Sequence, residues 1–200
     1  MKKIILAFVL LISAFVGYKF FQESKSNIVI TEAKAEKSFN SLDEMNSYSP
    51  LIVIGTKTNE KTIIDRDDEG YMNYFFTLSD FKINKVFKNK TGKVIEKDGN
   101  IIILETEAKD DKSDQLFSVS GYQLMEKQNQ YLLFLEPNSS EDKSFANTFN
   151  IEGVVDGKFS FQKDKNKRDE IDKRETSEYE KDALNNHRKM YNELNHKYSY

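Results

Sequence analysis

The sequence predicts a mainly β protein built as an antiparallel barrel or sandwich. Five or six short segments are rich in β-branched and aromatic residues, and no helix-length crossover separates them. Hydrophobic residues make up 38% of the chain, with 15 Phe and 10 Tyr, which is enough for a compact core. The 200 residues leave room for one domain of ordinary size between a distinctive N-terminus and a charged tail.

The first 21 residues have the layout of an export signal or membrane anchor. Lys2 and Lys3 precede a run, residues 4–16, that is apolar except for Ser13. An uncleaved helix over residues 4–21 would be about 27 Å long, which just crosses a bilayer core. The lysines favour a cytoplasmic N-terminus and hence an external C-terminal domain on a single-span cell-membrane protein.

Cleavage of this segment is the alternative. The small-x-small site that ends at Ala35 lies far beyond the apolar run, and a cut there would release a secreted protein. A helix buried in a soluble protein is a third interpretation. Residues 22–38 are polar and lack turn signals, so they are predicted to be a linker to a domain over residues 39–162.

The domain is predicted to begin with a short capping helix. Ser41 and Glu44 form a capping-box pattern, and about two turns of helix should follow and end at Tyr48, before Pro50. The β-branched run at residues 51–54 then predicts a first strand, with a bulge or close backbone approach at Gly55. Residues 59–70 are expected to form a loop.

The stretch Tyr74–Gly92 is predicted to be a strand. Helical spacing from Phe76 meets polar residues, whereas a period of two fits apolar positions on either side of Ser79 and Asp80. The phase changes at these two residues, which predicts a β-bulge. The remaining predicted strands are Asn100–Ala108 after an Asp98-Gly99 turn, Phe117–Leu124, Gln130–Pro137, covered on both faces, and a hairpin over Phe149–Phe161 that turns at Asp156-Gly157.

Four segments of the chain resemble a group of uncharacterised exported bacterial proteins: "SLDEMNSYSPLIVIGTKT", "TLSDFKINKVFKNKTGKV", "NQYLLFLEPN" and "FNIEGVV". The resemblance covers residues 39–161 and implies an OB-like barrel of the netrin/TIMP type. TIMP-type inhibitors chelate zinc through an N-terminal cysteine, and this chain has no cysteine. Their inhibitory mechanism therefore does not carry over.

Charge and composition narrow the class of partner. Residues 36–162 contain 15 Lys and Arg against 22 Asp and Glu, a balance of −7 that would repel a phosphate backbone. Nucleic-acid binding is therefore disfavoured. The absence of cysteine excludes disulfides, thiolate metal sites and a cysteine nucleophile.

An acidic segment is the nearest match to a metal loop. In EF-hand register the acidic residues fall at the first ligand positions, but position 12 is Phe76 rather than Glu, and no helices flank the loop. A looser calcium site or a solvated acidic loop remain the two interpretations. The residues concerned are Asp65, Asp67, Asp68 and Glu69.

No catalytic constellation or cofactor site is predicted. The only histidines, His187 and His196, lie in the C-terminal segment, and no G-x-S-x-G motif is present. Residues 163–200 carry ten positive and nine negative charges, and a helix there would display an apolar stripe. The stripe predicts either weak pairing with a partner helix or packing on the barrel; its members are Leu184, Tyr191, Leu194 and Tyr198.

Together these features predict a tethered or secreted binding module for a protein or cell-envelope component, without a catalytic centre. OB barrels bind across their central strands and adjoining loops, here expected at residues 59–70 and 109–115. Aromatic side chains at the rim are expected to be Tyr71, Tyr74 and Tyr122. The alternatives are a secreted protease inhibitor that works without metal chelation, and an unrecognised enzyme.

Overall fold

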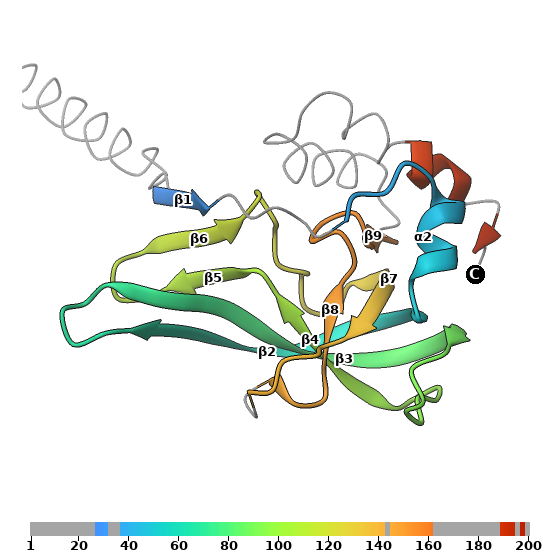
Figure 1. Cartoon of the computed structure of the whole chain (residues 1–200), viewed down its shortest axis with the longest axis horizontal. Coiled ribbons are helices and arrows are strands. Elements are labelled where there is room, and N and C mark those ends of the chain that lie inside the picture. Colours follow the sequence, from blue (N-terminus) through green and yellow to red (C-terminus); the bar gives the residue numbers. More distant parts are fainter. Residues whose placement is uncertain (1–26, 32–36, 143–144, 162–188, 195–196, 199–200) are drawn as a thin grey trace, which may run out of the picture.

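The computed structural model describes residues 27–31, 37–142, 145–161, 189–194 and 197–198, and within them the chain is mainly β, as predicted. Figure 1 shows the arrangement. The elements are β1 (Asn27–Thr31), α2 (Leu42–Tyr48), β2 (Leu51–Arg66), β3 (Met72–Asn89), β4 (Asn100–Glu105), β5 (Glu107–Asp110), β6 (Gln115–Val119), β7 (Gln130–Pro137), β8 (Thr148–Ile151) and β9 (Lys158–Ser160), with a further helical segment at residues 189–194.

Six strands form one sheet in the order β2-β3-β4-β8-β7-β9. β2 also pairs with β7, so the pairings of β2, β3, β4, β8 and β7 form a ring. Neighbouring strands of this sheet are antiparallel except β4 and β8, which are parallel. A second sheet has the order β1-β6-β5, with β1 parallel to β6. The prediction of a wholly antiparallel arrangement was therefore wrong at these two pairs.

The predicted hairpin over residues 149–161 does not form. β8 and β9 lie on the same edge of β7, one after the other, and both pair with it rather than with each other. A tight turn around Gly153 separates them, in which the Val155 N–H donates to the Gly153 carbonyl over 2.7 Å. β8 and β9 run in the same direction along β7, so the Asp-Gly signal marked an interruption between two strand segments rather than a reversal of the chain.

The stretch that begins at Tyr74 is a strand, as predicted, and it belongs to a long hairpin with β2. The expected loop at residues 59–70 was wrong, because β2 continues to Arg66 and only a short turn joins the strands. The second sheet covers the distal part of this arm. The Phe75 and Phe117 rings lie 5.7 Å apart, and Arg66 forms an ion pair with Asp110 at 3.1 Å.

The predicted bulge at Ser79 and Asp80 was also wrong. Thr77, Ser79, Phe81 and Ile83 are all buried, so β3 keeps one inward phase through this region. The extra residue is Thr58 on the partner strand, where the register shifts. Apolar periodicity failed because two inward positions carry hydroxyl groups that bond to acceptors inside the fold.

Two apolar cores lie on opposite faces of the strands. The inner core contains Val53, Phe81, Ile103, Leu133 and Phe149, among others. The outer core is formed by alternate residues of β2 and β7 together with α2 and the C-terminal helix. β7 therefore contributes to both cores, which confirms the prediction that both of its faces are covered.

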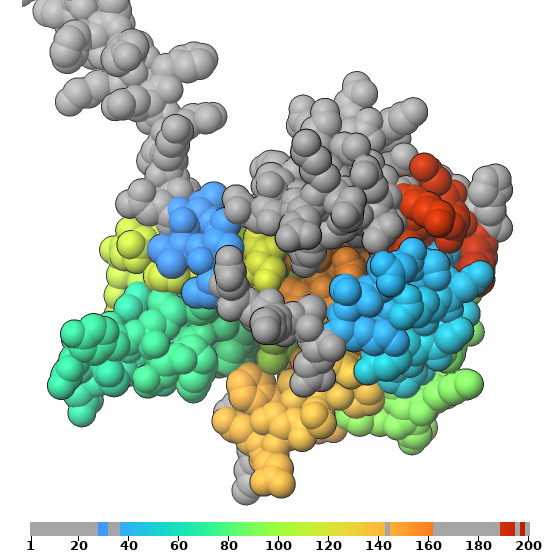
Figure 2. All heavy atoms as spheres, turned by 45° about the horizontal axis from the view of Figure 1, so that its top comes forward, coloured from blue at the N-terminus to red at the C-terminus, as the bar shows by residue number. Residues whose placement is uncertain are grey.

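α2 begins as its capping pattern predicts. The Glu44 N–H donates to Ser41 Oγ over 3.1 Å, and Glu44 Oε2 accepts from the Asn40 N–H. The C-terminal helix packs beside α2 (Figure 2). Tyr191, Leu194 and Tyr198 are buried in the outer core, whereas Leu184 lies outside the described residues.

The N-terminal predictions fall mostly outside the described residues, including the predicted membrane helix over residues 4–21 and the cleavage site at Ala35. In the part of the chain that the structure describes, no helix is long and apolar enough to cross a membrane. Within the predicted linker, Asn27–Thr31 forms strand β1 on the edge of the second sheet.

Candidate functional site

A cavity of about 460 Å³ opens beside β4, β8 and the end of β7. Its walls come from the loop after β7, the turn after β8, Tyr122, and Lys37 and Tyr48 at either end of the α2 region. A volume of this size is typical of small-ligand sites. Apolar and polar groups contribute comparably to the walls.

Strand register builds the floor of the cavity. Leu104 pairs with Asn150, and Asn150 pairs with Glu136, so the three side chains lie in one row on the same face of three neighbouring strands. The preceding residue on each strand belongs to the inner core, so the row faces away from that core: Ile103, Phe149 and Leu135. The Asn138 side-chain amide donates to Asn150 Oδ1 over 3.1 Å and fixes the polar side of the floor.

Glu152 is the most unusual group in the wall. Its backbone N–H donates to the Phe134 carbonyl over 3.0 Å, and only 4% of the residue is exposed. Within the described chain its Oε1 atom makes no hydrogen bond, and neither does the buried Thr106 Oγ1 in the same wall. Buried polar atoms are normally paired, so two unpaired acceptors in one cavity call for a donor from outside the fold.

The protonation of Glu152 reflects this environment. Its pKa is raised to about 7, first because burial disfavours the charged carboxylate and second because the Glu136 carboxylate repels it. Lys37 and Lys88 act in the opposite direction, but weakly. Glu152 therefore changes charge near neutral pH.

Lys37 is already engaged at the cavity wall. Its Nζ lies 3.4 Å from Glu44 Oε1 and 4.1 Å from the centre of the Tyr48 ring. An ion pair and a cation–π contact thus share the charge of this lysine. The Glu136 carboxylate also lines the wall and repels that of Glu152.

An aromatic row leads from the hairpin arm to the cavity. The rings of Tyr74 and Phe76 stack at 5.8 Å, and Phe76 lies 5.0 Å from Phe145, which lines the cavity. Tyr74, 46% exposed, forms the outer end of this row.

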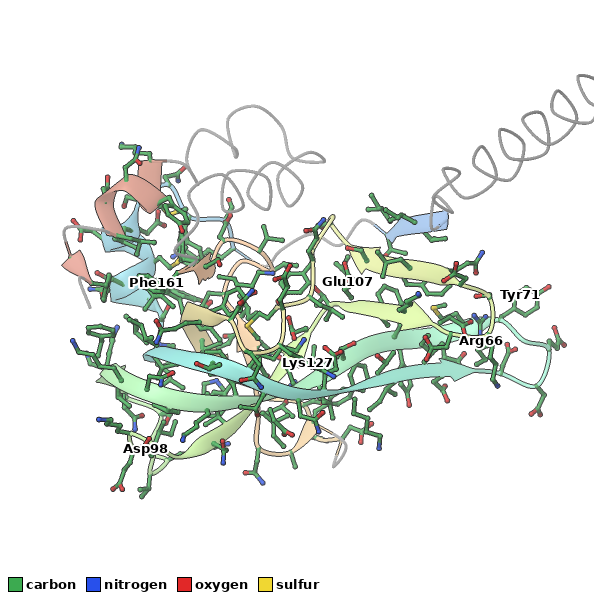
Figure 3. All side chains as sticks on the ribbon, turned by 180° about the vertical axis from the view of Figure 1, so that it is seen from behind. Arg66, Tyr71, Asp98, Glu107, Lys127 and Phe161 are labelled. Carbon is green, nitrogen blue, oxygen red and sulfur yellow. The ribbon has the colours of Figure 1, made fainter. Side chains whose placement is uncertain are left out.

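The three aromatic residues predicted at the rim are not brought together. Tyr122 is buried and lines the cavity, while its hydroxyl donates to Glu105 Oε2 over 2.7 Å. Tyr71 is 69% exposed at the tip of the β2–β3 hairpin, far from Phe161 at the other end of the molecule (Figure 3). Only Tyr122 and, through two rings, Tyr74 are connected to the cavity.

The two predicted binding loops lie beside each other but away from the cavity, joined by the Arg66–Asp110 ion pair. In the acidic segment Asp67 Oδ1 accepts the backbone N–H groups of Glu69 and Tyr71, and Asp65 Oδ2 accepts from Asn73. These contacts order the turn. Among the described residues no group of three or more His, Cys, Asp or Glu could hold a metal ion.

A buried polar network supports the cavity from within. Glu105 accepts from Lys57 Nζ and Ser79 through Oε1, and from the Tyr122 hydroxyl and the Met125 N–H through Oε2. Because Tyr122 belongs to both the network and the cavity wall, the network fixes the position of that wall.

Sequence reasoning missed Glu136, Glu152 and the Lys57–Glu105 pair. One signal was available for Glu152, which is a single acidic residue inside the apolar run "FNIEGVV". The histidines that enzyme hypotheses would need lie outside the described residues.

Comparison with known proteins does not identify a family for this chain. No protein-family model matches the sequence, and no curated protein is significantly similar to it.

Proposed function

We propose that this chain is an extracytoplasmic binding module with an OB-like β-barrel, whose ligand site is the cavity beside β4, β8 and β7. The unpaired, buried Oε1 atom of Glu152 is the observation that carries the proposal. A binding partner that donates a hydrogen bond to it would relieve an unmet interaction of the free protein.

The strand pairings support the OB-like part of the proposal. Five strands, β2, β3, β4, β8 and β7, pair in a ring. An OB-fold is a five-stranded Greek-key barrel that binds through its central strands and the loops that flank them. The loop between β7 and β8 supplies cavity residues Asn138, Ser139 and Phe145, which supports a site at one of the loops that such a barrel would use for recognition.

The N-terminal pattern supports an external location. Two lysines followed by an apolar run are typical of an export signal or anchor. Protease treatment of intact cells, followed by intact-mass analysis of the protein from membrane and medium, tests the location and the cleavage together. A protein that is found whole in the cytosol would contradict the proposal.

The binding site is tested by blocking the cavity in the full-length chain. Ser139 lines the cavity and is exposed, so Ser139→Trp should fill the opening without disturbing a core. Val94 is 88% exposed and does not line it, which makes Val94→Trp a matched control. Solubilised envelope material from the organism that makes the protein is passed over each immobilised variant.

We expect a component that the wild type and Val94→Trp both retain and that Ser139→Trp loses. Components held equally by all three variants would place binding elsewhere. A fold comparison by circular dichroism confirms that Ser139→Trp is still folded.

A further inference from the structure

We infer that the cavity binds a primary ammonium group on an aliphatic stem, with its charge placed between Glu152 and Glu136. This inference rests on the proposed function, since it names the chemical class of the ligand of that site. The carriers of such a group are a free aliphatic amine or the side chain of a peptide lysine, which share one chemistry.

The acceptors in the wall set the first requirement. Glu152 Oε1 and Thr106 Oγ1 are buried and make no hydrogen bond within the described residues. A carboxylate oxygen can only accept, and a hydroxyl can both accept and donate. An ammonium group has three donors and no acceptor, so it matches a wall that offers oxygen acceptors.

Charge sets the second requirement. Glu136 and Glu152 both line the cavity and repel each other, while the Lys37 charge is shared with Glu44 and the Tyr48 ring. A neutral polyol would donate hydrogen bonds but leave this repulsion in place. An anion would add to it, and a cation removes it.

A metal ion fits less well than an amine. Calcium takes six to eight oxygen ligands, and in the part of the chain that the structure describes no group of three or more acidic or histidine side chains is gathered. An ammonium needs fewer acceptors than calcium, and the wall offers the unpaired Glu152 Oε1 and Thr106 Oγ1.

The apolar part of the cavity suits the carbon stem. Leu104, Phe145 and Val154 line it beside the polar floor. Methylene groups of a lysine-like chain would lie against these side chains while the charged end reaches the carboxylates. The volume of about 460 Å³ leaves room for the stem and for the group that carries it.

Binding should be linked to the loss of a proton from Glu152. The charged groups that act on it are Glu136 from β7, Lys88 from β3, and Lys37, which precedes α2. An ammonium binds the ionised carboxylate, so the affinity should rise as the pH passes upward through about 7. The Glu152 proton is released to solvent.

The test uses the full-length chain in detergent micelles and isothermal titration calorimetry. The probes are 1,5-diaminopentane, Nα-acetyl-lysine N-methylamide, and 1,5-pentanediol as a neutral match. The variant Glu152→Gln keeps the shape of the side chain and removes its charge. Glu96, which is exposed and does not line the cavity, provides the matched control Glu96→Gln.

At pH 8 we expect at least one amine to bind more than tenfold more tightly than the diol. Glu152→Gln should weaken amine binding at least tenfold, and Glu96→Gln should change it less than twofold. Between pH 6 and pH 8 the affinity of the wild type should rise about tenfold, because a group with a pKa near 7 goes from mostly protonated to mostly ionised, and that of Glu152→Gln should stay level. The relative affinity of the two amines identifies the free or the peptide source.

Three results would overturn the inference. The first is a diol that binds as tightly as the amines. The second is an equal loss of amine binding in the two Gln variants, which would indicate general attraction to an acidic surface. The third is failure of both amines to bind. The function proposed above is judged separately, because the Ser139→Trp comparison does not depend on the charge of the ligand.

Discussion

Lys57 Nζ lies 2.8 Å from Glu105 Oε1, and both side chains are fully shielded from solvent. Glu60 Oε2 lies 2.6 Å from the same ammonium group, and Tyr122 and the Met125 N–H complete the shell of Glu105. A buried carboxylate with this many partners is satisfied, but the removal of one charge leaves the other uncompensated.

We therefore expect Lys57→Met to lower the free energy of unfolding by about 3 kcal/mol. The double variant Lys57→Met/Glu105→Gln should be more stable than Lys57→Met alone, because it no longer buries an isolated negative charge. Urea denaturation of the full-length chain measures both. Lys61→Met, at an exposed position of the same strand, should change stability by less than about 0.5 kcal/mol.

Additive losses in the double variant would contradict the prediction. They would indicate that the hydrogen bonds from Tyr122 and Met125 stabilise Glu105 whether or not Lys57 is present.

The buried carboxyl groups predict a pH-dependent stability. The pKa of Glu152 is raised to about 7 from 4.5, chiefly by burial, and that of Asp156 to about 6 from 3.8, also chiefly by burial. The folded chain therefore holds these protons more tightly than the unfolded chain, and their contribution to stability falls as the pH rises. Stability begins to fall at a pH near the pKa values of the unfolded chain and stops falling above the pKa values of the folded chain.

Glu152→Gln isolates one of these groups. Relative to the wild type, the variant should gain stability between pH 4.5 and pH 7, by at most about 1.4 kcal/mol per pH unit, and the difference should then level off. Urea denaturation at a series of pH values measures the difference. A difference that stays constant with pH would contradict the prediction that burial raises the pKa of Glu152.

Gly55 should not tolerate a side chain. A Cβ atom there would overlap the Phe81 ring and the Lys82 carbonyl oxygen, and both belong to packed structure. We expect Gly55→Ala to cost about 3 kcal/mol of unfolding free energy. Gly70 is the comparison: its φ of +88° disfavours alanine, but no atom lies within 4 Å of the added carbon, so Gly70→Ala should cost about 1 kcal/mol.

Equal losses at the two glycines, measured by thermal and urea unfolding, would mean that backbone conformation alone sets the cost. The close approach at Gly55 was expected from the sequence, and its partner, Phe81, became visible only in the fold.

The C-terminal helix should contribute directly to stability. Leu194 is 2% exposed in the outer core, so Leu194→Ala is expected to cost about 3 kcal/mol. Asn192 lies on another face of the same helix and is exposed, so Asn192→Ala should leave the free energy of unfolding nearly unchanged. Chemical denaturation of the full-length variants compares them, and two neutral substitutions would mean that the helix does not stabilise the folded domain.

Local signals predicted the elements better than their partners. The pair Ser41 and Glu44 specifies the start of a helix, and the consecutive apolar residues of β7 specify a strand with both faces buried. Each signal depends only on residues a few positions apart in the sequence. The polar second half of β2 was mistaken for a loop, since its pairing depends on β3 and its cover on the second sheet.

The cavity was beyond sequence reasoning for the same reason. Its floor requires three strands in register, and the parallel pairing of β4 with β8 joins segments that no turn connects. The expected rim residue Tyr122 did reach the cavity, but as a buried wall residue bonded to Glu105 rather than as an exposed aromatic. An isolated acid in an apolar run was the one usable clue to Glu152.

The pairing of Ile102 with Thr148 has a consequence for how the molecule is made. Until β8 pairs with β4, one edge of β4 has no neighbouring strand. The strands that precede it then form an incomplete sheet with an exposed, unpaired edge. Chains dominated by such distant contacts acquire their native state in milliseconds to seconds rather than microseconds. During that interval the nascent protein would be most vulnerable to self-association, and shielding by a chaperone would help it most.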